Sequence, residues 1–194
     1  MKSKKGSSFE RQIATKLSLW ASEGKYDDWY WRTAGSGGRA KARARTGQKT
    51  INSYGDIKPE CGEAEFLFSH CILELKNGYG KFSFLDCLDK AKTRKNEILQ
   101  HFEKFYEQAA GDAENAERGN KVYPVIIFKR DKRQPVIVFP FNFYKLLVGN
   151  KKLKVRKIIY DSTQSDAKIK CKVVAILLDD FFNHFTPNDF RSLQ

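Results

Sequence analysis

The stretch CILELKNGYG, residues 71–80, places a glutamate and a lysine inside an otherwise apolar run. Alternate side chains of a β-strand share a face, so Glu74 and Lys76 would lie together on one face. Leu73 and Leu75 would lie on the other face, which the strand would bury. Burying a charge is costly unless it is paired or bound to a metal. The pattern therefore indicates either an ion pair between neighbouring side chains or one half of a catalytic site.

A second acid, Asp56, lies 18 residues upstream of Glu74 in the stretch YGDIKPE. A hairpin between the two segments would bring both carboxylates together, and they would repel one another unless a divalent cation neutralised them. Mg²⁺ held there could polarise a phosphoryl oxygen, while Lys76 oriented the attacking water. The alternative for Asp56 is a turn-forming Gly-Asp pair.

Composition limits the class of protein. The chain has 194 residues, of which 41% are hydrophobic, enough for one α/β domain with a packed core. Its formal net charge of +13 predicts a polyanionic partner, most simply nucleic acid. No run approaches the roughly 20 apolar residues of a membrane span, and the basic N-terminus lacks the apolar stretch of a signal peptide. We expect a cytoplasmic protein with no membrane partner.

Periodicity and turn residues predict a succession of helices and strands, and one α/β domain is the simplest account of them. Expected helices cover residues 7–22, 84–117 and 141–148, with a last helix from Thr186; Gly111 and Gly119 suggest a break and a stop. Expected strands cover residues 28–33, 54–58, 66–76, 123–130, 134–140, 155–160 and 169–178. Ser7 to Glu10 matches a capping box at the start of the first helix.

Two segments ahead of Asp56 differ in character. Trp29 and Trp31 belong to an aromatic strand, and packing in the core is favoured over stacking on bases. Residues 34–55 are rich in glycine and basic residues and contain no acid. They predict a basic loop that contacts phosphates, with an ordinary solvated loop as the alternative.

The ordered set Glu10, Gly35-Ser36-Gly37, Asp56, Glu74 and Lys76 resembles the PD-(D/E)xK nuclease superfamily. Within it, the chain is most similar to Holliday-junction resolvases of the archaeal and phage type, whose R-x-x-G-S-G segment is matched by residues 32–37. The resemblance covers residues 5 to about 130 of the sequence, and residues 131–194 would be a C-terminal extension of the same domain. One departure is the glycine before Asp56, where the superfamily has proline.

The resemblance implies roles for particular residues. Asp56, Glu74 and the Leu75 carbonyl would bind the metal, Glu10 would complete the acidic cluster, and Lys76 would position the water. Glu10 has an alternative as the third residue of the capping box. Ser36 would contact the scissile phosphate. Further contacts to DNA would come from Arg32, Gly35, Gly37, Arg39, Lys41, Arg43, Arg45 and Gln108; for Gln108 the alternative is an ordinary helix surface.

The resemblance also implies a restriction-endonuclease-like α/β fold, with a mixed central β-sheet flanked by helices. It implies as well a DNA endonuclease that depends on Mg²⁺ or Mn²⁺. The implied substrate is branched DNA such as a Holliday junction, cut by a homodimer in DNA recombination and repair. The resemblance further implies a protein encoded by a prokaryote or a phage, with no nucleotide cofactor. One alternative is a restriction-type or phage DNA-degrading endonuclease that acts on duplex DNA. The other is a non-catalytic nucleic-acid-binding protein in which the acids are structural.

Overall fold

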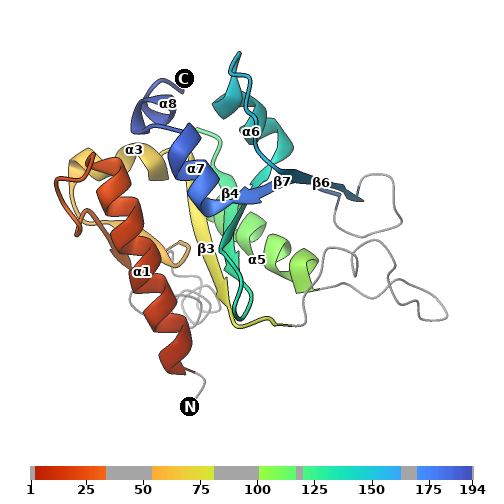
Figure 1. Ribbon diagram of the computed structural model, residues 1–194, viewed down its shortest axis with the longest axis horizontal. Coiled ribbons are helices and arrows are strands. Elements are labelled where there is room, and N and C mark those ends of the chain that lie inside the picture. Colours follow the sequence, from red (N-terminus) through yellow and green to blue (C-terminus); the bar gives the residue numbers. More distant parts are fainter. Residues whose placement is uncertain (1–2, 34–53, 81–100, 117–119, 163–169, 194) are drawn as a thin grey trace.

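The computed structural model describes residues 3–33, 54–80, 101–116, 120–162 and 170–193, and these form an α/β fold built on a mixed sheet (Figure 1). The sheet has the strand order β3-β4-β5-β7-β6, in which β3 and β4 are parallel and the other neighbours are antiparallel. Its strands are β3 (Cys71–Asn77), β4 (Tyr123–Lys129), β5 (Val136–Pro140), β6 (Lys157–Asp161) and β7 (Lys172–Leu177). A separate antiparallel pair consists of β1 (Tyr30–Arg32) and β2 (Ile57–Pro59).

Helices cover both faces of the large sheet, as Figure 1 shows for α1 and α5. The helices are α1 (Ser3–Ala21), α3 (Glu65–Phe68), α5 (His101–Ala116), α6 (Phe141–Val148), α7 (Leu178–His184) and α8 (Pro187–Arg191), with a 3₁₀ turn at Gly62–Ala64. The apolar stripe of α1 packs with Leu73 and Leu75 in one core cluster. Phe102 and Phe105 of α5 pack with Phe128 on the opposite face. The predicted α/β class, a mixed sheet flanked by helices, is confirmed.

The predicted strand over residues 66–76 is wrong in its first half. Residues 65–68 form α3, in which Leu67 is buried and the Ser69 N–H donates to the Glu65 carbonyl at 2.9 Å. The expected hairpin between residues 54–58 and β3 is also absent. β2 pairs with β1 instead, and a 3₁₀ turn and α3 separate β2 from β3 along the chain.

Two helix boundaries differ from the prediction. α1 begins at Ser3, so Ser7 to Glu10 lie inside the helix and do not cap it. α5 continues through Gly111 because Ala109 and Ala113, on either side of it, are buried and hold the helix against its neighbours. A glycine inside a helix costs only about 1 kcal/mol, which such packing readily offsets.

The tryptophan prediction is half right. Trp29 packs partly against the core and stacks on Tyr26 with ring centroids 5.8 Å apart. Trp31 is 44% exposed, because strand alternation turns Tyr30, fully buried, toward the core and Trp31 away from it. Aromatic content therefore predicted a buried face but not which residues form it.

The C-terminal third follows the predicted order. β4, β5 and α6 lie where expected, and α8 follows Thr186, whose side chain and Asp189 form a capping box. α7 was not predicted, although Leu178, Phe181 and Phe185 recur at helical spacing and are buried. Among the described residues, none of the helices has both the length and the apolar character needed to cross a membrane.

Candidate active site

Asp56 lies against the edge of β3, held there by backbone geometry. Its N–H donates to the Leu73 carbonyl at 2.8 Å, and its Oδ2 accepts the Leu75 N–H at 2.8 Å. Gly55 precedes it with φ 74, and a Cβ at Gly55 would stand 2.7 Å from the Leu73 oxygen. Only glycine fits this approach. The glycine that replaces the proline of the superfamily motif therefore has a steric reason here.

Glu74 is 2% exposed and lies between two donors. Gln108 Nε2 on α5 donates to Glu74 Oε1 at 2.8 Å, and the Lys76 ammonium contacts the same oxygen. Lys76 Nζ also donates to Gln108 Oε1 at 3.2 Å and lies 5.4 Å from the centroid of the Phe105 ring. Strand β3 and helix α5 thus fix Glu74, Lys76 and Gln108 in a closed triangle.

Glu10 forms the other half of the acidic cluster. It lies on α1, where its Oε2 is 3.1 Å from Arg32 Nε of β1. The Thr33 N–H, one residue further, donates to the Asp56 carbonyl at 2.9 Å. The end of β1 therefore ties α1 and Asp56 together. The position of Glu10 inside α1 rules out the capping role considered from sequence.

The carboxylates are electrostatically coupled. Burial, with the charge of Asp56 next, raises the pKa of Glu74 to about 7, although Lys76 opposes the shift. Burial and Asp56 also raise the pKa of Glu10, against the opposing charge of Arg32. Both shifts arise where negative charge is crowded and little solvated. The cluster holds more negative charge than Lys76 and Arg32 neutralise.

The donor set suits a hard divalent cation. Mg²⁺ commonly takes one or two protein carboxylates and keeps several waters, and Asp56 and Glu74 supply two carboxylates beside the Leu75 peptide. A cation there would oppose both causes of the raised pKa of Glu74, which are its burial first and the charge of Asp56 second. Within the described ranges, no three histidine, cysteine or acidic side chains are close enough to form a complete cage by themselves.

The structure brings together Glu10, Arg32, Asp56, Glu74, Lys76 and Gln108. Gln108 contacts the two β3 side chains, and Arg32 pairs with Glu10, contacts that were not predicted for either residue. The remaining predicted site residues, Gly35, Ser36, Gly37, Arg39, Lys41, Arg43 and Arg45, lie outside the described residues.

Sequence reasoning missed two groups on α5. Phe105 lies beneath the Lys76 ammonium, and the charge of Asp112 adds to the rise in the Glu74 pKa. Their spacing is the signal that could have found them, because residues three and four positions from Gln108 share its helix face.

The parallel β3–β4 pair, the acid-x-lysine sequence on β3 and the acid against its edge define a restriction-endonuclease-like nuclease core. Over residues 1–192 the chain matches the model of the family described as "Phage putative PDDEXK endonuclease". The chain belongs to this family, and so to the PD-(D/E)xK superfamily, whose nucleases generally use divalent metals. The match extends beyond residue 130, where the resemblance of the motifs ends. Comparisons with curated proteins and with solved structures gave no match.

Proposed function

We propose that the protein is a divalent-metal-dependent endonuclease that hydrolyses phosphodiester bonds of DNA, with residues 1–194 acting as one nuclease domain. The observation that carries the proposal is the buried Glu74, which contacts Lys76 and Gln108 and whose pKa is raised by burial and by the charge of Asp56. A merely structural ion pair would need neither the second carboxylate nor the glutamine. Family membership supports the same class of reaction.

In this proposal Asp56, Glu74 and the Leu75 carbonyl hold Mg²⁺ or Mn²⁺. Such a cation, when bound, polarises a phosphoryl oxygen and lowers the pKa of a bound water. Lys76 orients the attacking water and stabilises the negative charge that develops on the phosphate. Gln108 holds the Glu74 carboxylate and the Lys76 ammonium in position through its hydrogen bonds to both groups. Glu10, restrained by Arg32, completes the acidic cluster.

The test is cleavage of plasmid DNA with and without Mg²⁺ or Mn²⁺. We expect cleavage only with the metal, and Lys76→Ala and Glu74→Ala to reduce the rate by about 10²-fold or more. Lys58→Ala, which removes a partly exposed β2 lysine that pairs with Glu60, is the matched control and should cut normally. If Lys76→Ala and Glu74→Ala cut as well as wild type, the site is wrongly assigned. Salt-dependent DNA binding without any cleavage would favour a non-catalytic binding protein.

For the substrate we propose branched DNA such as a Holliday junction, cut by a homodimer. The support is the similarity of residues 32–37 to the resolvase segment, within which Ser36 would contact the scissile phosphate. A four-way junction has two-fold symmetry, which suits a symmetric dimer. Cleavage of a junction should exceed cleavage of a duplex of the same sequence, and sedimentation should give twice the chain mass. Equal rates on both DNAs would instead indicate a restriction-type or DNA-degrading endonuclease.

A further inference from the structure

The turn between β4 and β5 combines positive charge with an unfavourable backbone conformation. Residues 129–133, KRDKR and here called the basic turn, contain four basic residues and one acid. The Arg133 N–H donates to the Arg130 carbonyl at 3.1 Å, which makes Lys132 the third residue of the turn. Lys132 has φ 58, in the left-handed region that glycine or asparagine normally occupies at this position.

No packing requirement accounts for lysine at this position. Lys132 is exposed, and no ion pair joins it to an acid in the part of the chain that the structure describes. Glu23 is the other non-glycine residue with positive φ among the described residues, and it follows the end of α1, where left-handed residues commonly close helices. A strained conformation at an exposed, charged turn position points to a function of the side chain.

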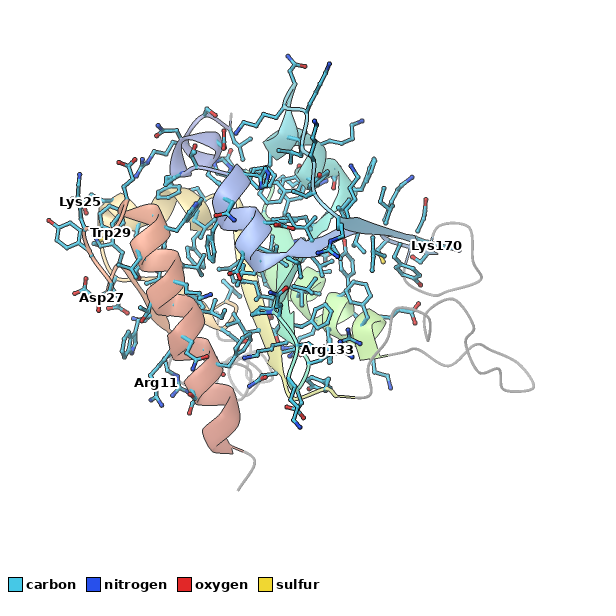
Figure 2. All side chains as sticks on the ribbon, viewed as in Figure 1. Arg11, Lys25, Asp27, Trp29, Arg133 and Lys170 are labelled. Carbon is cyan, nitrogen blue, oxygen red and sulfur yellow. The ribbon has the colours of Figure 1, made fainter. Side chains whose placement is uncertain are left out.

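The basic turn lies beside the candidate active site. β4 pairs with β3 so that Phe128 is opposite Lys76, and the Gly78 N–H donates to the Lys129 carbonyl at 3.1 Å. At about 3.3 Å per strand residue, Arg130 is about 7 Å beyond the row that contains Lys76. Figure 1 shows the β4–β5 connection at the end of β3, and Figure 2 labels Arg133 at this end of the molecule.

We propose that the basic turn binds the sugar-phosphate backbone of the nucleic acid beside the scissile phosphate, with Lys132 as a contact residue. The inference rests on the proposed nuclease function. Each strand of a duplex carries one phosphate for about every 3.4 Å of helix axis, so a strand held at Lys76 presents further phosphates within reach of the turn. Glycine at position 132 would remove the backbone strain, but it would also remove the ammonium group. The contact between this ammonium group and a phosphate explains why the position is a lysine.

The test separates fold stability from binding, because the two should change in opposite directions. Lys132→Gly and Lys132→Asn both accept positive φ, and each should raise the melting temperature by about 2–4 °C. Each should also lower the slope of log affinity against log salt by about 0.9, which is a roughly eightfold loss of affinity at 0.1 M salt. The measurement is fluorescence anisotropy of a labelled DNA duplex with the full chain, in EDTA so that no cleavage occurs. Lys132→Arg keeps the charge and should keep the wild-type slope.

The matched control is Lys25→Gln, which removes the same charge from an exposed lysine beyond the far end of α1 (Figure 2). It should leave the slope unchanged. If Lys132→Gly and Lys132→Asn have the same slope of log affinity against log salt as wild type, the proposal is overturned, whatever their melting temperatures. If wild type cleaves DNA while those variants bind normally, only the role of the basic turn fails. If wild-type protein neither binds nor cleaves DNA, the proposed function fails with it.

Discussion

Gly55 shows how a single backbone position can hold a catalytic acid in place. Its φ of 74 and its approach to the Leu73 carbonyl leave no room for a side chain. The next residue, Asp56, is joined to β3 by hydrogen bonds through both its N–H and its carboxylate. Any shift of Gly55 must therefore move a proposed metal ligand.

We predict that Gly55→Ala lowers the free energy of unfolding by about 2 kcal/mol or more, because it adds both a left-handed alanine and a steric clash. Metal-dependent cleavage should fall further than stability alone explains. Gly62→Ala is the control, since a Cβ there meets nothing within 4 Å, and it should change stability by less than about 0.5 kcal/mol. Urea unfolding checks both values, and equal effects of the two substitutions would contradict the prediction.

Glu74 gives the metal-free protein a specific pH dependence. Its pKa is about 7 in the folded chain, against 4.5 for an ordinary glutamate, so the native state binds the proton more tightly than the unfolded state. Stability in EDTA should therefore fall as pH rises from about 4.5 to 7. Glu74→Gln should remove this loss and be more stable than wild type at pH 8, by up to about 3 kcal/mol.

Thermal unfolding of both proteins across this pH range measures the effect. Mg²⁺ should restore the stability of wild type at pH 8 and leave Glu74→Gln less affected. The pKa of Glu10 is also raised, so the stability of Glu74→Gln should still fall as pH rises, but by less than in wild type. If the difference in melting temperature between the two proteins is the same at all pH values, the titration of Glu74 is not its cause.

Among elements, α5 shows what the sequence could and could not predict. Its amphipathic pattern predicted a helix, and the alternation along residues 71–77 predicted which face of β3 carries Glu74 and Lys76. The contact between Gln108 and these two side chains depends on how α5 packs across the sheet, which periodicity along one segment does not specify. The pairing of β2 could not be predicted for the same reason. Its partner is β1, and only the packed core determines that choice.

We predict that Gln108→Ala slows cleavage by about tenfold while leaving α5 folded. It removes a donor to the ionised form of Glu74, so the pKa of Glu74 should rise and the acidic limb of the pH–rate profile should move to higher pH. Glu107→Gln changes an exposed neighbour on the same helix and should leave the profile in place. An unchanged profile in Gln108→Ala would mean that the glutamine does not act through Glu74.

At the scale of the whole molecule, the net charge of +13 predicted a nucleic-acid partner, and family membership agrees with that class. Net charge alone does not say which basic residues make contact. The site on β3 contributes Lys76, and the basic turn lies next to it. Arg39, Arg43 and Arg45 precede Asp56 in the chain and lie outside the described residues, so their role remains a prediction from sequence.

We predict that replacing Arg39, Arg43 and Arg45 together by glutamine lowers the salt slope of DNA binding by about 2.7, which is the loss of three phosphate contacts. The melting temperature should stay nearly constant, because a glycine-rich basic segment has little apolar surface to bury. The control replaces Lys16, Lys25 and Lys58 together, and so removes the same charge from described surface positions. Anisotropy titrations in EDTA measure both slopes. If the salt slope of DNA binding falls equally in the two triple variants, overall charge alone attracts the DNA. A loss confined to the arginine variant would mean that residues 39–45 contact the phosphates directly.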